Sequence, residues 1–386
     1  MDFRLTDEQI QLRETARKYA RAELGDIARH CEETSTPPSR DLIRQYGDMG
    51  FLGVNIPQKY GGLGLGNLEA LLILEEFAKI SSAVAFPIFE SCVGPVKAIE
   101  HFGSEALKKR IIPAVCKGEA VVAIAMSEPD AGSALTDLKT KAVKKRDSHI
   151  LDGNKRWCSG GGHADAYLVY CRMSGDKGAR GIGAVCVEKD MDGLSFGPQE
   201  DLMGFRGIPS SDIYFDNVEI PEENVVVHAG GFQKLMEAFD LERCGNGTMA
   251  LGQASGALED VLQYVQDRRQ FGKPIVDFQA VQLRLADMQM KVEAARLLVQ
   301  RVACNTEHGL PSVLDSSVAK CFANETAREV TGHAVQLMGA YGYAKAYGME
   351  RRMRDAWGWG IAGGAIDIQK INITAAMIGR RFNQRA

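Results

Sequence analysis

An acid and an arginine stand side by side in the middle of the chain, at Glu242 and Arg243 in the segment Phe-Asp-Leu-Glu-Arg of residues 239–243. Apolar residues recur around them at helical spacing, so both side chains belong to a predicted helix that begins near Phe232. In one interpretation Glu242 is a general base and Arg243 fixes an anionic or polar part of a ligand. In the ordinary interpretation the two charges lie on a solvated helix face. The segment alone favours the ordinary interpretation, and features elsewhere in the chain decide between the two.

The composition argues against several other kinds of site. A net charge of -4 on 386 residues gives no general affinity for nucleic acid or an anionic membrane. The nine cysteines form no Cys-x-x-Cys pair and the seven histidines no His-x-x-x-His, which argues against a metal site or a disulfide framework and fits a reducing compartment. The first residues lack a basic region followed by an apolar core, and no run approaches the length of a membrane span. We therefore expect a cytoplasmic protein with no membrane partner, although a processed organellar protein would give the same pattern.

The elements that must position these residues fall into three segments. Residues 1–120 carry helical signals, with capping residues at Thr6, Ser39 and Ser104. The glycine-rich residues 61–66 follow no clear strand and end without a Lys-Ser/Thr pair, so we interpret them as a turn before a helix and not as a phosphate loop. Over residues 121–230, short β-like runs separated by glycine turns predict a small antiparallel barrel or sandwich, at 121–126, 149–151 (before a turn at Asp152-Gly153), 167–170, 183–187, 213–215 and 218–220.

Residues 231–386 are helical again. Long periodic runs cover 232–267, 278–307, 313–339 and about 364–382, which is typical of a four-helix bundle. The predicted fold is thus α+β and mainly α, with an N-terminal helical domain (1–120), a central β domain (121–230) and a C-terminal four-helix bundle (231–386).

Four stretches, followed by Arg-Asp-Ala at 354–356, resemble the acyl-CoA dehydrogenase family and occur in the family's order. They are residues 125–133 (Ala-Met-Ser-Glu-Pro-Asp-Ala-Gly-Ser), 155–160 (Lys-Arg-Trp-Cys-Ser-Gly), 267–274 (Asp-Arg-Arg-Gln-Phe-Gly-Lys-Pro) and 336–343 (Gln-Leu-Met-Gly-Ala-Tyr-Gly-Tyr). The resemblance spans essentially the whole chain. It implies the acyl-CoA dehydrogenase fold, an FAD cofactor, a homotetramer built as a dimer of dimers, and electron-transferring flavoprotein as partner.

The resemblance also implies which residues bind FAD. Trp157 would stack on the flavin ring, Ser159 would bond near its reactive nitrogen, and Arg268 and Gln270 would reach the pyrophosphate of FAD in a neighbouring subunit. Without the resemblance, we would interpret Trp157 as a core tryptophan, residues 127–133 as a polar loop, and Arg268 and Gln270 as an exposed helix end. The full implied set is Met126, Ser127, Gly132, Ser133, Trp157, Ser159, Arg268, Gln270, Phe271, Gln336, Gly339 and Ala340.

The chain departs from the family where most members carry their catalytic glutamate, because Gly363 occupies that position. A minority, including isovaleryl-CoA dehydrogenases and enzymes like crotonobetainyl-CoA reductase, uses a glutamate on the helix where Glu242 lies. The resemblance therefore implies a relocated base, Glu242, that removes the α-proton of an acyl thioester. Gly363 keeps the backbone amide that binds the developing oxyanion in the family.

Further departures concern cofactor and substrate. Ala365 replaces a threonine that usually contacts FAD, and Ala134 stands where an aspartate is common. Glu90 falls in the stretch that lines the acyl pocket in relatives, where it could recognise a polar or cationic acyl group, act as a second base, or face outward. Glycines at 363–364 suit a branched, cyclic or aromatic acyl group. The predicted substrate-binding residues are Ser133, Arg243, Glu90 and Gly364.

The resemblance, together with these departures, implies an FAD-dependent acyl-CoA dehydrogenase that forms a 2-enoyl-CoA from a branched, cyclic, aromatic or polar acyl-CoA in preference to a long straight chain. Three alternatives stay open: an enoyl-CoA reductase on the same scaffold, a catalytically silent flavin-binding partner protein, and a lyase- or oxidase-like relative. No metal is expected at the site.

Overall fold

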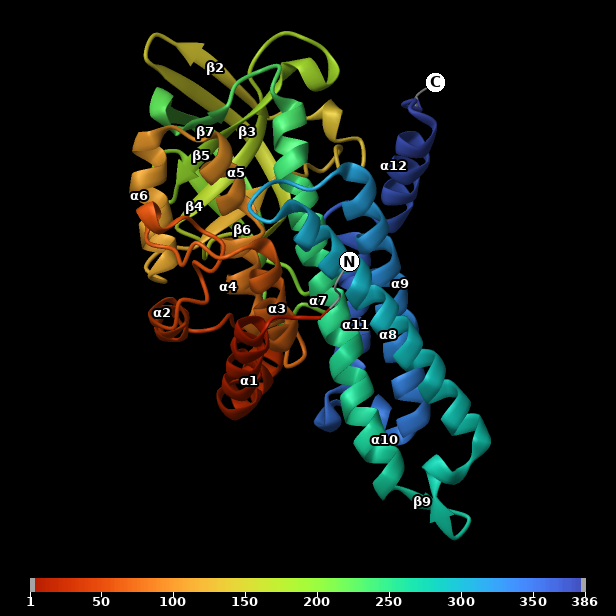
Figure 1. Ribbon diagram of the computed structural model, residues 1–386. Helices are drawn as coiled ribbons and strands as arrows, with labels where there is room; N and C mark the ends of the chain where they lie inside the picture. Colours follow the sequence, from red (N-terminus) through yellow and green to blue (C-terminus); the bar gives the residue numbers. More distant parts are fainter. Residues whose placement is uncertain (1–3, 383–386) are drawn as a thin grey trace.

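The computed structural model describes residues 4–382 (Figure 1). Helices fill the N-terminal part, and their starts follow from the capping residues. Thr6 forms a capping box with Gln9, and the hydroxyls of Ser39 and Ser104 accept bonds from backbone N–H groups three residues on. The helices of this part are α1 (Asp7–Thr34), α2 (Arg40–Asp48), α3 (Asn67–Ala78), α4 (Ser82–Cys92), α5 (Pro95–Phe102) and α6 (Glu105–Cys116).

The central part is one mixed sheet in the strand order β6-β7-β3-β2-β4-β5-β8, with β1 beside β4. Most pairs are antiparallel, as predicted. The sequence did not indicate that β1 and β2 run parallel to β4. The strands are β1 (Val122–Ala125), β2 (Lys141–Lys145), β3 (Ser148–Ser159), β4 (Ala166–Arg172), β5 (Ile182–Glu188), β6 (Leu194–Gln199), β7 (Ser210–Pro221) and β8 (Val225–Val227).

The predicted turn at Asp152-Gly153 was wrong, because β3 runs straight through these residues. The pairing of β3 with β7 shifts register between Leu151 and Gly153, which marks a β-bulge. Gly153 has a φ of 137°, and a Cβ there would lie 2.7 Å from the Cα of Thr140. The glycine therefore serves a close approach inside a strand and does not end it.

The C-terminal part is a helix bundle built on α7 and α9, and the fourth predicted run differs from the prediction. An unpredicted helix, α11, precedes α12, with a break at residues 362–365. The bundle elements are α7 (Phe232–Asp267), a hairpin of β9 (Arg269–Gln270) and β10 (Lys273–Pro274), α8 (Gln279–Thr306), α9 (Val313–Met338), α10 (Ala340–Tyr343), α11 (Met349–Ile361) and α12 (Ile366–Ile378). In Figure 1, α7 runs from beside the sheet to the β9 hairpin at the far end of the molecule.

The N-terminal helices and the bundle share one hydrophobic core, in which α3 and α4 pack against α7. Within the described chain, Ser82–Phe102 is long and apolar enough to cross a membrane by length and composition, which the sequence analysis did not anticipate. Most of this segment is buried inside the protein, as in the core of a soluble protein. The domain boundaries remain a prediction, and residues 1–3 and 383–386 lie outside the described part.

The Arg-Asp-Ala motif joins the three parts. The carboxylate of Asp355 on α11 accepts a bond from the backbone N–H of Phe205 at 2.8 Å. Arg354 donates to the carbonyl of Met203 at 2.7 Å and pairs with Glu32 on α1 at 2.5 Å. These contacts fix the sheet and the N-terminal helices against the helix that leads to Gly363.

Candidate active site

Glu242 lies in a stretch of α7 that has no solvated face. Every residue from Ala238 to Leu258 is buried, and Glu242 is 7% exposed. Small residues permit this packing: a Cβ on Gly252 would lie 2.3 Å from the Cβ of Ala78. The ordinary interpretation of Glu242 and Arg243 as a solvated pair is therefore wrong.

Arg243 is held by Asp240, one turn earlier on the same helix. The two side chains form a buried ion pair, and the hydroxyl of Ser316 on α9 donates to Asp240 at 3.0 Å. The guanidinium also lies 5.1 Å from the centre of the Phe239 ring, and its Nε has no hydrogen-bond partner among the described residues. Arg243 therefore keeps a free donor for a ligand, in an orientation fixed by Asp240.

The carboxyl of Glu242 makes no hydrogen bond within residues 4–382. Burial raises its pKa to about 8, and the nearby charges of Lys320 and Arg243 oppose that shift. A carboxylate with such a pKa is basic enough to compete for a carbon-bound proton and is still partly ionised at neutral pH.

Glu90 faces the same place from α4 and is not directed outward. It is 5% exposed and has no hydrogen-bond partner in the described chain. Burial and the charge of Glu242 raise its pKa well above the ordinary range. A Cβ on Gly160, at the end of β3, would lie 3.7 Å from its Oε1. Glu90 thus lies beside both Glu242 and the segment predicted to contact the flavin.

The break between α11 and α12 brings Gly363 to the turn of α7 that follows Glu242. A Cβ on Gly363 would lie 3.3 Å from Nδ2 of Asn246 and 3.4 Å from Nζ of Lys320. Asn246 donates to the carbonyl of Ala362 at 3.2 Å. Gly363 therefore lies about one turn of α7 from Glu242, while the convergence of the two positions on one substrate carbon stays a prediction.

Gly364 has its own structural reason to lack a side chain. Its φ of 84° is left-handed, and a Cβ would lie 2.4 Å from Nε2 of Gln369. Backbone geometry and packing thus account for this glycine independently of the acyl group.

Residues 126–133, which follow β1, are anchored by a buried ion pair. Lys155 on β3 donates to the carboxylate of Glu128 and to the carbonyl of Met126, both at 2.9 Å. Glu128 also accepts two backbone N–H bonds, from Lys139 and Thr140. The turn that carries Gly132 and Ser133 is therefore held in place while those two residues stay exposed.

Trp157 presents its ring to the surface. It is 50% exposed, its φ of 60° is rare for a tryptophan, and the Arg156 guanidinium lies 4.4 Å from the ring centre. Ser127 and Ser159 lie nearby in sequence and pairing: the Arg156 N–H bonds the Ser127 carbonyl, and Ser159 pairs with Ser210 of β7. An open aromatic face beside hydroxyls and backbone amides fits a flavin ring.

The other predicted cofactor residues lie at the far end of the bundle. Arg268 ends α7 about 39 Å from Glu242, at 1.5 Å per residue. Phe271 at the hairpin tip is 92% exposed. The structure does not bring this group to Trp157 within one chain; the group comprises Arg268, Gln270, Phe271, Gln336, Gly339 and Ala340.

The sequence analysis missed Lys320 and Asn246. Lys320 is fully buried on α9, and Asn324 bonds Asn246 at 2.9 Å. The available signal was a lysine at helical spacing with Ala319, Ala323 and Ala327 on the apolar face of α9.

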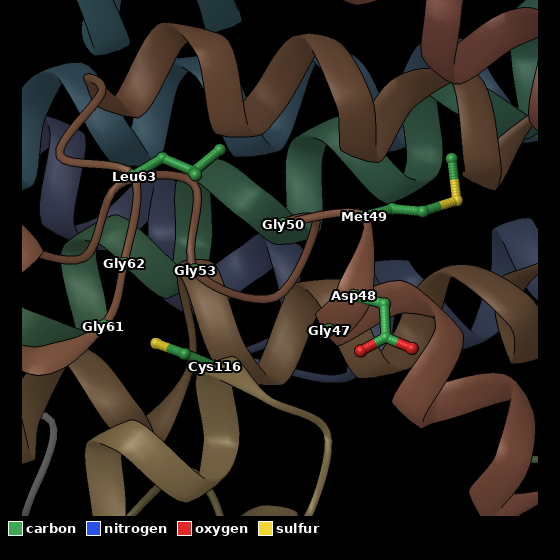
Figure 2. Close-up of a pocket in the computed structure, with 9 residues that line it drawn as sticks. All are labelled: Gly47, Asp48, Met49, Gly50, Gly53, Gly61, Gly62, Leu63 and Cys116. Carbon is green, nitrogen blue, oxygen red and sulfur yellow. The ribbon is translucent and has the colours of Figure 1, made fainter.

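A separate cavity of about 240 Å³ lies in the N-terminal part (Figure 2). Gly61 and Gly62 border it together with Leu63 and Cys116. A 3-10 turn, Gln58–Tyr60, precedes this glycine-rich segment and α3 follows it, which agrees with a turn and not a phosphate loop. In residues 4–382, no group of three or more His, Cys, Asp or Glu side chains could hold a metal ion.

Three family models match the chain from end to end. They describe the acyl-CoA dehydrogenase N-terminal domain (residues 6–119), middle domain (residues 123–218) and C-terminal domain (residues 229–378).

Curated relatives align over nearly their whole lengths. A probable acyl-CoA dehydrogenase, FadE25 of Mycobacterium tuberculosis, is 37% identical over 97% of each chain. A 3-sulfinopropanoyl-CoA desulfinase of Cupriavidus necator is 36% identical over 99% of this chain and 98% of its own. An acryloyl-CoA reductase (NADH) of Anaerotignum propionicum is 36% identical over 98% of this chain and 97% of its own.

Solved structures agree. Butyryl-CoA dehydrogenase from Megasphaera elsdenii superposes with a TM-score of 0.94 at 34% identity, covering 98% of this chain and 100% of that one. A chain in the structure of the electron transferring flavoprotein of Acidaminococcus fermentans gives 0.94 at 36% identity with the same coverage. The FAD complex of PigA gives 0.92 at 27% identity over 98% of this chain and 99% of that one.

Proposed function

The chain belongs to the acyl-CoA dehydrogenase family, and from this premise we propose that Glu242 is the base that removes the α-proton of an acyl-CoA thioester. The observation that carries the proposal is a buried carboxyl with no hydrogen-bond partner in the described part of the chain. Its pKa is about 8, and it lies near a position that holds glycine where most of the family carries its glutamate. Glu242 has no structural bond to break when it takes a proton.

FAD is the cofactor of this family, and it supplies an acceptor for the hydride that leaves the β-carbon. Trp157, Ser159 and Ser127 would hold the flavin ring of FAD within one subunit. Because Arg268 and Phe271 lie at the other end of α7, we propose that they contact FAD bound to a second copy, in a homotetramer. Gln270, Gln336, Gly339 and Ala340 belong to the same contact.

The remaining residues position the thioester. Arg243, held by Asp240, would offer its free Nε to the CoA part, and Ser133 on its exposed turn would help to position the thioester. The N–H of Gly363 donates to the thioester oxygen as negative charge develops there. Water is excluded because this part of α7 is buried on every side, which keeps the Glu242 carboxylate basic.

For the acyl group we propose a polar, branched, cyclic or aromatic unit and not a long straight chain. Glu90 places a buried polar group beside Glu242, which disfavours a purely aliphatic chain. The desulfinase relative carries a polar acyl group in its name, which supports this class. Electrons would pass to electron-transferring flavoprotein, and a cytoplasmic location remains our expectation.

A second candidate, an enoyl-CoA reductase on the same scaffold, is favoured by the acryloyl-CoA reductase among the relatives. The same residues serve both directions: Glu242 would then donate the α-proton that it otherwise removes. The electron donor and the substrate potential set the direction.

The test is anaerobic flavin bleaching of the purified holoenzyme by a panel of acyl-CoA thioesters. We expect the bleaching rate to fall by about 10²–10⁴-fold in Glu242→Gln. The control Glu237→Gln, one turn away and with no assigned role, should bleach at the wild-type rate. Bleaching that persists in Glu242→Gln would move the base elsewhere, with Glu90 next to be replaced.

Two other outcomes separate the alternatives. No bleaching by saturated thioesters, with reoxidation of reduced flavin by an enoyl-CoA, would favour the reductase. If acyl-CoA thioesters do not bleach the flavin and enoyl-CoA thioesters do not reoxidise it, a flavin-binding protein without this activity is favoured.

A further inference from the structure

Lys320 is a buried cation to which no carboxylate of residues 4–382 is bonded. Its side chain on α9 is fully buried, and Nζ donates to the carbonyls of Ala362 and Gly364, the latter at 2.6 Å. These two acceptors are neutral. A buried ammonium bonded only to neutral groups costs stability, so its presence at this position calls for a compensating effect.

The two carbonyls that Lys320 binds flank Gly363. One ammonium therefore ties both ends of the Gly363 unit to α9, while Asn246 ties the Ala362 carbonyl to α7. Gly363 and Gly364 both have left-handed φ angles, 65° and 84°, which the free chain would visit only part of the time. These bonds select one orientation for the Gly363 peptide.

Lys320 also acts on Glu242 through its charge. Its charge is the largest influence that lowers the pKa of Glu242, ahead of that of Arg243. In turn, burial and the charge of Arg243 lower the pKa of Lys320 to about 7, while Cys321 and Glu242 oppose that shift. Lys320 in its charged form thus stabilises the Glu242 carboxylate.

The other titratable groups around Glu242 cannot replace this effect. Glu90 on α4 and Tyr170 on β4 are acids whose pKa is raised by burial, so neither can supply a positive charge. Arg243 is already paired with Asp240. Around Lys320 itself, Arg328 adds only a further positive charge.

We propose that Lys320 is a positioning residue of the reaction, which fixes the Gly363 peptide for the thioester oxygen and whose positive charge favours the ionised form of Glu242. The inference rests on the proposed function of Glu242. The proposal assigns two effects to the Lys320 side chain: it holds the Gly363 peptide, and its charge acts on Glu242. Asn246 also holds the peptide but is uncharged, so a variant of Asn246 separates the two effects.

The experiment compares Lys320→Met, Lys320→Arg and Asn246→Ala in the holoenzyme. The first readout is the pH midpoint of anaerobic flavin reduction by a reactive acyl-CoA. Lys320→Met should move this midpoint up by about one pH unit, a tenfold change in the ionised fraction at pH 7. Asn246→Ala should lower the rate without moving the midpoint, because it loosens Ala362 and leaves the charge in place.

The second readout needs no turnover. Infrared difference spectra of each variant against its Glu242→Gln counterpart give the protonation midpoint of the Glu242 carboxyl. The same upward shift is expected in Lys320→Met and none in Asn246→Ala. If Glu242 were not the base, this titration would still report the effect of Lys320, so the failure of either proposal is distinguishable.

Lys320→Arg keeps the charge and changes the donor geometry. It should keep the wild-type midpoint at a reduced rate, and it provides the test if Lys320→Met does not fold. An unchanged midpoint in Lys320→Met, or a midpoint raised in Lys320→Arg, would overturn the proposal and leave Lys320 as a packing residue.

Discussion

Arg243 pairs with Asp240, one turn earlier on α7, and not with its sequence neighbour Glu242. The cation beside the candidate base therefore has its own counter-charge. Arg243 acts on Glu242 only as a nearby charge. The effect of burial on the pKa of Glu242 is therefore larger than the opposing effect of the nearby charges, and the pKa rises to about 8.

The first prediction concerns pH and stability. The pKa of Glu242 rises from 4.5 to about 8 on folding, so the folded protein binds this proton more tightly than the unfolded chain. The stability contributed by the neutral carboxyl is complete below about pH 4.5 and is lost as the pH rises through about 8, by up to a few kcal/mol. Glu242→Gln removes this dependence. In denaturant titrations, the free energy of unfolding of the wild type should fall relative to that of Glu242→Gln between about pH 5 and pH 9. If the difference between the two free energies stays constant over this range, the prediction is wrong.

The second prediction concerns the ion pair that anchors residues 126–133. Lys155→Met leaves the buried Glu128 without its cation, which should cost about 3–5 kcal/mol and weaken FAD retention. Thermal unfolding and FAD release during gel filtration measure the two effects. Lys139→Met is the matched control, because it breaks an exposed pair with Asp130 in the same region and should change little. Equal losses in both variants would contradict the anchoring role.

The third prediction concerns Trp157. Replacing it with alanine should weaken FAD binding about two- to tenfold, because stacking adds roughly 0.5–1.5 kcal/mol, and should alter flavin fluorescence. The stability of the apoprotein should change little, since half of the side chain is exposed. Trp357→Ala is a control of similar exposure, at 44%. Unchanged fluorescence in Trp157→Ala would remove the residue from the flavin site.

The fourth prediction concerns Phe271 at the tip of the β9–β10 hairpin. A ring that is 92% exposed adds little to the folding of one chain, so Phe271→Ser should unfold at the wild-type denaturant concentration when monomeric. If a second copy covers Phe271 in the wild type, the mass of Phe271→Ser from light scattering should be lower than that of the wild type. The variant should also lose FAD at protein concentrations at which the wild type still retains it. Val143→Ser, an exposed apolar residue on β2, should do neither. An unchanged mass in Phe271→Ser would exclude this contact.

Periodicity and capping residues predicted the fold well, because helices with one apolar face repeat at a fixed spacing. The same signal failed where geometry departs from that rule. The buried stretch of α7 includes polar residues but has no solvated face, so its pattern could not show that Glu242 is buried. Small residues such as Gly252 allow this packing. Gly153 was misread as a turn because a bulge and a turn use the same residue type.

Most candidate site residues were predicted from the family motifs, and few from residue types and spacing alone. Glu242 became a candidate base because Gly363 lacks a side chain, a comparison between positions 121 residues apart. Lys320 belongs to no motif that the sequence analysis used, and its role depends on the backbone break between α11 and α12. The sequence analysis predicted a helix over about 364–382 but did not predict α11 before it. Contacts between such distant segments arise from tertiary packing and leave no local pattern.

The place of Lys320 has a consequence for where the base of such a site can lie. Its ammonium lies 3.4 Å from where a side chain at position 363 would begin, and its charge also acts on Glu242. A carboxylate at either position would meet the same cation. The proposed base could therefore occupy either position without a new counter-ion, because one buried cation serves both places.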